Sequence, residues 1–174
     1  RPDLGLDYLA VGHVTADVML DGGVRAGGAV TYAVATASAL GLRAGFVTRA
    51  RPGRPPLDLP GGVLHCLVAS HDTTTFVNAY DAAGRRNQTL LALAPPLVAD
   101  DVPPEWDRVG VLHLAPVARE IGADVASGIA ADFVGDSPAS DDVGDGEPAP
   151  GFNTRYASSS TRFLSGERLI TQFE

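Results

Sequence analysis

The sequence predicts an α/β fold with a parallel sheet, and two features of the chain predict it. Short apolar runs without alternation occur at 7–12, 44–48 and 109–115, as is typical of strands buried on both faces. A segment of small side chains that favours a helix, 31–40, separates the first run from the second. The order strand, helix, strand indicates a parallel sheet with right-handed crossovers.

Composition excludes several classes of function. The 174 residues suffice for one domain with a core, and the net charge of −8 argues against a nucleic-acid or anionic membrane surface. No apolar run approaches the roughly 20 residues that span a bilayer, so we expect no membrane partner. The single cysteine, Cys66, permits no internal disulfide and predicts a reducing, cytoplasmic location.

The first half of the sheet can be followed element by element. The run 7–12 is a strand, 18–20 is a second short strand, and the Asp-Gly-Gly at 21–23 ends it with a turn. After the helix at 31–40, Gly41 lies where a left-handed helix cap is expected. The strand at 44–48 follows, and then a loop rich in Pro, Gly and Arg at 49–62 without a helical pattern.

An antiparallel insertion is predicted next, over about 63–92. Residues 63–69 are apolar, and residues 73–80 alternate so that Phe76, Asn78 and Tyr80 share one face. The Asp-Ala-Ala-Gly at 81–84 is a hairpin loop, and 85–92 returns as the paired strand. The Pro-Pro at 95–96 ends this unit.

The second half predicts fewer elements. Asp100 and Asp101 cap a short helix, and the strand at 109–115 is followed by a helix on which Val117, Ile121 and Val125 recur at four-residue spacing. A last strand begins at 133. We therefore expect a sheet domain over 1–135 and an irregular tail over 136–174, where Ser, Asp, Gly and Pro replace the apolar pattern.

Two features point to a ligand site. Asp17 follows a buried strand at its carboxyl end, where α/β sheets bind ligands; its carboxylate can accept sugar hydroxyls or cap a turn. Gly27 and Gly28 precede the helix and let backbone amides approach a ligand closely, or serve only the turn. Ala-Val-Thr follows the glycines where a phosphate loop needs Lys-Ser/Thr, so we favour a sugar contact.

Other polar residues carry weaker signals. Phe76 and Asn78 can close over an acceptor, whereas Arg85 and Arg86 could meet phosphate but are expected to be a solvated hairpin end. The spacing of four further residues matches no zinc pattern, and we expect no metal there: His65, Cys66, His71 and Asp72. Two acids after the strand at 109–115 are expected on a solvated helix face: Glu120 and Asp124.

The order of these motifs resembles the ribokinase-like (PfkB) carbohydrate kinases. The resemblance rests on LAVGHVTADVML, on AGGAVTYAVATASALGLRAGFVT, on TTTFVNAYDAAGRRNQTLLALAPPL as a lid hairpin, and on PPEWDRVGVLHLAPVAREI. It covers roughly 7–135 and implies an incomplete ribokinase-like parallel sheet with flanking helices and a small antiparallel β lid. It also implies that a sugar or polyol acceptor binds at Asp17, Gly27, Gly28, Tyr32, Phe76 and Asn78.

The family transfers a phosphoryl group from ATP, with Mg²⁺, to an alcohol. Its catalytic Asp lies in a Gly-Ala-Gly-Asp motif at a helix start, and neither this motif nor the family's Asn-x-x-Glu occurs in this chain. Tyr32 also stands where the family usually has Asn. We therefore expect a truncated or frameshifted kinase chain that lacks the ATP-binding half, has no catalytic residue and is inactive by itself.

Three functions remain open at this point. The first is a PfkB-type carbohydrate kinase, present here through its acceptor-binding half. The second is a non-catalytic pseudokinase fragment that binds a small polyol or pairs through its lid hairpin, possible as a homodimer. The third is a plain nucleotide-binding α/β domain.

Overall fold

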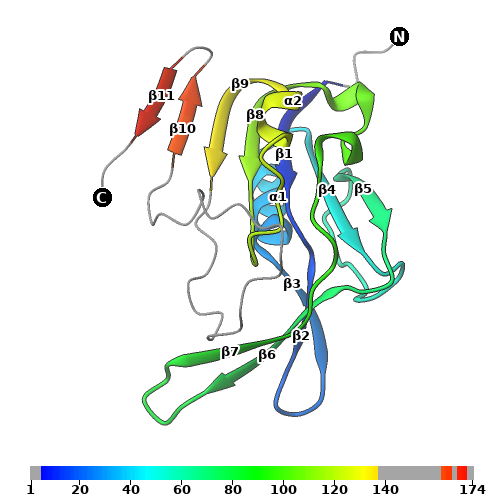
Figure 1. Cartoon of the computed structure of the whole chain (residues 1–174), viewed down its shortest axis with the longest axis vertical. Helices are drawn as coiled ribbons and strands as arrows, with labels where there is room; N and C mark the ends of the chain where they lie inside the picture. Colours follow the sequence, from blue (N-terminus) through cyan, green and yellow to red (C-terminus); the bar gives the residue numbers. More distant parts are fainter. Residues whose placement is uncertain (1–4, 137–161, 166–167, 172–174) are drawn as a thin grey trace.

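The computed structural model describes residues 5–136, 162–165 and 168–171, and these form two sheets (Figure 1). The larger sheet has the strand order β11-β10-β9-β8-β1-β4-β5. Its strands are β1 (Leu6–Val11), β4 (Ala44–Ala50), β5 (Leu64–Ala69), β8 (Arg108–Leu114), β9 (Ala130–Asp136), β10 (Arg162–Ser165) and β11 (Arg168–Thr171). The five strands from β9 to β5 are parallel, which confirms the predicted parallel sheet.

The smaller sheet, called the lid sheet below, has the order β3-β2-β6-β7 and projects beyond one end of the larger sheet (Figure 1). It consists of β2 (Thr15–Val18), β3 (Val24–Gly27), β6 (Thr74–Tyr80) and β7 (Arg86–Ala92). β2 leaves the carboxyl end of β1 after only three residues, so the lid sheet begins at the edge where parallel sheets bind ligands.

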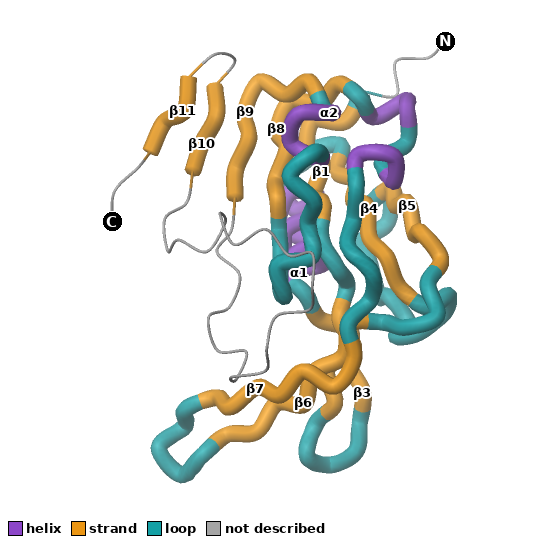
Figure 2. Tube along the Cα trace, in the orientation of Figure 1, coloured by secondary structure: helices purple, strands orange, loops and turns teal. Residues whose placement is uncertain are grey.

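Helix is scarce, as Figure 2 shows. α1 (Ala29–Ala39) is the one long helix among the described residues; α2 (Val125–Gly128) and the 3₁₀ turns Ala99–Asp101 and Pro104–Trp106 are short. α1 ends as predicted, because Gly41 has φ 82° and its N–H donates to the Ser38 carbonyl (2.9 Å). No described helix is long and apolar enough to cross a membrane.

The core lies on both faces of the larger sheet. On one face α1 buries Val30, Val34 and Ala37 against Ala10 and Phe46. The opposite face packs under the loops and short helices after the lid sheet, through Leu9, Val11, Val47, Leu97, Trp106, Leu112 and Val125. Burial of such side chains contributes about 1.5–3 kcal/mol each, and it explains why these strands are apolar on both faces.

Two predicted boundaries are corrected. The strand expected at 18–20 runs over Thr15–Val18 and pairs with β3, which the sequence pattern did not predict. Residues 64–69 do not belong to the lid hairpin, because β5 pairs with β4 in parallel. The hairpin itself is confirmed: β6 pairs with β7, and the Asp81 N–H donates to the Arg85 carbonyl across the loop (3.0 Å).

The helix expected after β8 is wrong. Residues 117–124 take an irregular path, because Arg119 has φ 60° and Ile121 forms a bridge with Leu97. The Glu120 carboxylate accepts the Val117 and Ala118 N–H groups (3.1 and 2.7 Å), which holds this path without a helix. The predicted loop at 49–62 holds no helix, in agreement with expectation.

The predicted tail is described only in part. β10 pairs antiparallel with β9 and with β11, so these two segments extend the sheet where irregular chain was expected. The rest of the predicted tail lies outside the described residues.

Candidate functional site

The Asp17 carboxylate lies on one face of the lid sheet, called its inner face. Register places Asp17 beside Phe76 of β6 and Arg25 of β3, so these residues share the inner face. The Thr15 hydroxyl donates to Asp17 Oδ1 (2.8 Å), which fixes the carboxylate and leaves its other oxygen for a ligand.

The glycine pair before α1 serves two different purposes. A Cβ at Gly27 would lie 2.4 Å from Asp17 Oδ2, so the missing side chain leaves room for the carboxylate. Gly28 has φ 94° and ψ 143°, and a Cβ there would lie 2.3 Å from the His13 carbonyl oxygen. Gly28 therefore lets the helix start against the end of β1 in a conformation that other residues rarely adopt.

An open cavity of about 220 Å³ lies between the start of α1 and the inner face of the lid sheet. It brings together four residues predicted for acceptor binding: Asp17, Gly28, Tyr32 and Phe76. The remaining lining residues are Thr15, Ala29, Arg86, Gln88, Pro116 and Val117. Tyr32 is 68% exposed and offers both a ring and a hydroxyl, whereas Phe76 is buried.

Two predicted site residues do not line this cavity. Gly27 lies behind the Asp17 carboxylate, and Asn78 is buried with its side-chain carbonyl accepting a hydrogen bond from Gln88 Nε2 (3.0 Å). The acceptor cavity is therefore lined by Gln88 and not by Asn78 as predicted. The pattern at 85–92 did not single out Gln88, because only the hairpin register, with Asn78 opposite Gln88, shows which residues of β7 face inward.

Behind the cavity lies a buried polar network that sequence analysis missed. Glu120, expected on a solvated face, is fully buried, and its carboxylate accepts the His13 N–H (3.0 Å). The His13 ring contacts the Thr74 hydroxyl (2.7 Å) and the Pro95 carbonyl (3.1 Å). Burial lowers the pKa of His13, against a smaller opposing effect of the Glu120 charge. The network joins the segment after β1, the start of β6 and the irregular segment after β8.

A second polar pair, Tyr8 and His113, lies beside α1. The Tyr8 hydroxyl is hydrogen-bonded to His113 Nδ1. Burial raises the pKa of Tyr8 to about 12 and lowers the pKa of His113, so both side chains are neutral at physiological pH. The pair lines an apolar hollow that shares Tyr32 with the acceptor cavity.

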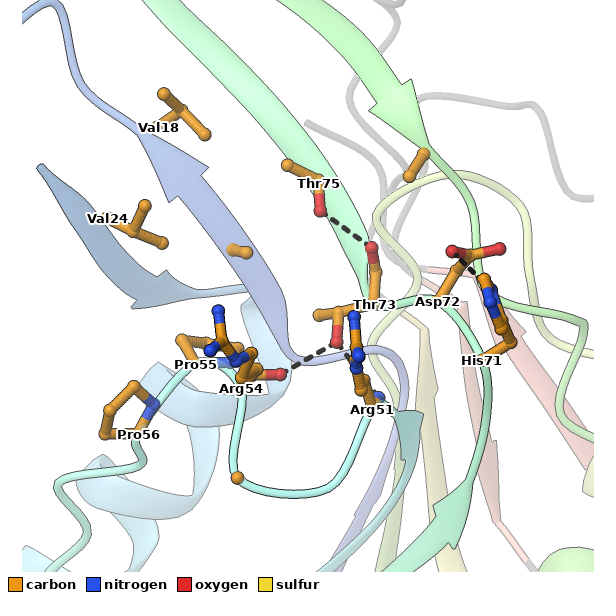
Figure 3. A pocket seen from close by; sticks show the side chains of 13 residues that line it. Val18, Val24, Arg51, Arg54, Pro55, Pro56, His71, Asp72, Thr73 and Thr75 are labelled. Atoms are coloured by element: carbon orange, nitrogen blue, oxygen red, sulfur yellow. Dashed lines mark hydrogen bonds and ion pairs between the residues drawn. The ribbon is translucent and has the colours of Figure 1, made fainter. Parts of the chain in front are cut away.

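A third cavity, of about 570 Å³, lies on the opposite, outer face of the lid sheet (Figure 3). Its floor is Val18, Val24 and Thr75, and its rim is the loop that carries Arg51 and Arg54. The Thr73 hydroxyl donates to the Arg54 carbonyl (2.7 Å) and accepts the Arg51 N–H (3.0 Å), so β6 is tied to this loop.

His65, Cys66 and the His71–Asp72 pair have different neighbours and form no common site. His65 stacks on Phe46, and the Cys66 thiol approaches the Asp101 carbonyl (3.8 Å). His71 pairs with exposed Asp72 (3.0 Å). Asp124, expected to be solvated, is exposed but caps the Ala99 N–H (2.9 Å). Within the described ranges no three His, Cys, Asp or Glu side chains are arranged to hold a metal ion.

Comparison with known proteins identifies the fold. No family model and no curated protein sequence matches the chain. Among solved structures, a pyrophosphate-dependent kinase in the ribokinase family, complexed with a pyrophosphate analog and myo-inositol, is similar. It is 13% identical with a TM-score of 0.51, over 95% of this chain and 77% of that one.

Fructokinase from Vibrio cholerae O395 in its apo form is also similar. It is 18% identical with a TM-score of 0.53, over 80% of this chain and 56% of that one. A double mutant of the same fructokinase, bound to fructose, ADP and potassium ion, has a TM-score of 0.50 at 18% identity, over 81% and 54% of the two chains. The chain therefore has the ribokinase-like (PfkB) fold, as its motif order predicted.

Proposed function

We propose that this chain is the acceptor-binding part of a carbohydrate kinase and binds a sugar or related polyol in the cavity between α1 and the lid sheet. The observation that carries the proposal is the convergence of Asp17, Gly28, Tyr32 and Phe76 on one cavity at the carboxyl edge of a parallel sheet. The similar kinases that hold myo-inositol or fructose support the same substrate class.

The lining residues suit a polyhydroxylated acceptor. The free oxygen of Asp17 accepts a hydrogen bond from a hydroxyl, and a charge-assisted bond of this kind is stronger than a neutral one. The Tyr32 ring and the edge of Phe76 contact the apolar faces of a sugar ring. Gly27 and Asn78 act indirectly in this proposal, by leaving room for Asp17 and by orienting Gln88.

The phosphoryl donor has no site among the residues described. The sequence lacks the Gly-Ala-Gly-Asp and Asn-x-x-Glu motifs, and no acidic cluster for Mg²⁺ is present in the described part of the chain. The residues present thus do not fit ATP and Mg²⁺, the family's usual donor and cofactor. We propose that the chain alone binds acceptor without phosphorylating it, and that it does so in the cytoplasm.

Isothermal titration calorimetry of the whole chain tests the proposal. Myo-inositol, fructose and ribose are titrated into the wild type, into Asp17→Ala and into Asp58→Ala, which removes an exposed carboxylate far from the cavity residues in sequence. We expect at least one polyol to bind the wild type and Asp58→Ala equally and to lose binding in Asp17→Ala. No binding by the folded wild type, or equal binding by both variants, would contradict the proposal. ATP turnover with the same acceptors would contradict the claim of inactivity.

The second candidate function is a non-catalytic pairing module, in which two copies pack their lid sheets together. The outer face of the lid sheet favours it, because that face is apolar and Val24 is 54% exposed. Light scattering after size-exclusion chromatography tests pairing. A dimer that Val24→Glu converts to a monomer supports this function, and a monomeric wild type at high concentration contradicts it.

A further inference from the structure

The inner face of the lid sheet carries two arginines, Arg25 and Arg86, and of these two it is Arg86 that lines the acceptor cavity, where the proposed polyol does not use it. Arg86 begins β7, and the hairpin register places it opposite Tyr80, on the face that also carries Asn78 and Gln88. Arg86 lines the acceptor cavity. The sequence predicts a solvated hairpin end for Arg85 and Arg86, and both side chains are exposed.

The two adjacent arginines have different surroundings. Arg85 lies in the hairpin loop, where its Nε atom pairs with Asp81 Oδ2 (2.7 Å). In the part of the chain that the structure describes, Arg86 forms no ion pair. The chain carries an excess of acidic residues, with a net charge of −8, so an unpaired guanidinium on a cavity wall is not explained by a general surplus of basic side chains.

Asp17, the carboxylate of the same cavity, does not neutralise Arg86. On β2, Asp17 lies opposite Phe76 of β6. On β7, Arg86 lies opposite Tyr80, which is four residues further along β6. Two strand spacings and four residues therefore separate the two charges across the sheet. The cavity has a hydrogen-bond acceptor at one end and a planar cation at the other.

From this arrangement we propose that the acceptor carries an anionic group, a carboxylate or a phosphate, which Arg86 binds while Asp17 binds the hydroxyls. The inference rests on the proposed function and specifies its substrate class as sugar acids or sugar phosphates. A guanidinium suits either anion, because its planar fork matches the two oxygens of a carboxylate or a phosphate. Gln88, held by Asn78, supplies a neutral amide beside the same anion.

The test compares four ligands by calorimetry on the whole chain: fructose, fructose 6-phosphate, gluconate and inorganic phosphate. We expect fructose 6-phosphate or gluconate to bind at least about tenfold more tightly than fructose, since a hydrogen-bonded charge pair contributes that much. Which of the two binds distinguishes the phosphate from the carboxylate. Arg86→Gln should remove the difference, whereas the matched variant Arg85→Gln, whose side chain lies in the loop, should keep it.

Other outcomes overturn the inference in distinguishable ways. If fructose and both anionic ligands bind equally, and Asp17→Ala abolishes all three, the anionic acceptor is wrong and the proposed function stands. If no ligand binds the folded chain, the proposed function fails and the inference fails with it. If inorganic phosphate binds as tightly as fructose 6-phosphate, Arg86 is a plain anion site.

A measurement on the wild type alone keeps the test independent of how Arg86→Gln folds. Raising the NaCl concentration from 20 to 500 mM should weaken binding of the anionic ligand and leave binding of fructose unchanged, because salt screens a partly exposed charge pair. An anionic ligand whose affinity does not depend on salt would overturn the role of Arg86.

Discussion

The two glycines before α1 can be separated by one substitution at each. In Gly27→Ala the new Cβ would lie 2.4 Å from Asp17 Oδ2 and 2.7 Å from the Thr15 hydroxyl oxygen. Ordinary contacts of a Cβ begin near 3.4 Å, so the carboxylate must move by about 1 Å. Because it is the end of a flexible side chain, the backbone can stay in place while the carboxylate turns away from the cavity.

The expected loss is therefore mainly in binding. Moving the carboxylate removes one charge-assisted hydrogen bond to the acceptor, about 1.5–3 kcal/mol, which weakens binding roughly 10- to 150-fold. The broken hydrogen bond from Thr15 to Asp17 lowers stability by about 1–2 kcal/mol. Part of this loss is offset, because alanine reduces the entropy of the unfolded chain by about 0.4–1 kcal/mol.

Gly28→Ala should lower the stability of the fold more than Gly27→Ala does. Its Cβ would lie 2.3 Å from the His13 carbonyl oxygen, and the backbone conformation, φ 94° and ψ 143°, is one that side chains disfavour. Neither can be relieved by a side-chain rotation. We expect the free energy of unfolding to fall by about 3 kcal/mol or more.

Urea denaturation followed by circular dichroism, and calorimetry with the polyol that the wild type binds, measure both effects. The reasoning holds if Gly27→Ala loses affinity with a small loss of stability and Gly28→Ala loses stability. Wild-type affinity in a folded Gly27→Ala protein would refute it, because Asp17 would then lie outside the acceptor site. Equal destabilisation by both variants would show that the pair serves only the turn.

Three further predictions concern the framework of the site. Glu120→Ala leaves the buried His13 N–H without an acceptor and should lower the free energy of unfolding by about 2–4 kcal/mol, measured by urea denaturation, with exposed Glu105→Ala as a control near zero. Burial holds the pKa of His13 and His113 below the ordinary 6.5. The contribution of these two histidines to the free energy of unfolding is therefore fully present above pH 6.5. Urea midpoints should fall as the pH drops below about 6.5, by up to about 1.4 kcal/mol per pH unit for each histidine, whereas a midpoint that rises would contradict the burial of these rings. Burial also raises the pKa of the Cys66 thiol, with smaller contributions from nearby acids, so a disulfide reagent at pH 8 should react several-fold more slowly with the folded chain than in urea.

The fold could be predicted from the sequence wherever a local pattern decides the structure. Apolar runs predicted the parallel strands, alternation predicted the β6–β7 hairpin, and Gly41 predicted the end of α1. β3 could not be predicted, because Val-Arg-Ala-Gly is a short, polar-interrupted segment that becomes a strand only by pairing with β2. The helix expected after β8 failed for the opposite reason: the four-residue spacing is real, but buried Glu120 holds the chain in another path.

The candidate site could also be predicted only in part. One cavity is lined by Asp17, Gly28, Tyr32 and Phe76. Local patterns predicted Asp17 at a strand end, Gly28 at a helix start and Phe76 on a strand face, whereas Tyr32 was singled out by the resemblance to ribokinase-like kinases. Whether Gln88 faces inward cannot be read from 85–92 alone. Side chains of a strand alternate, so a shift of one residue in pairing moves every side chain to the other face.

The hairpin loop determines which residues of β7 face inward, and a bulge near the base of the hairpin moves Ala92 to the outer face. Asp81 accepts the Ala83 and Arg85 N–H groups (2.9 Å each), and this closure sets Arg86 opposite Tyr80. Further along, the register shifts between Thr75 and Phe76, so that Thr75 pairs with Ala92 on the outer face while Phe76 pairs with Leu90 on the inner face. Alternation along the strands gives polar groups to the acceptor cavity and apolar groups to the outer face, and the bulge adds Ala92 to the outer face. The two candidate functions, binding and pairing, therefore use opposite faces of the same strands and do not exclude one another.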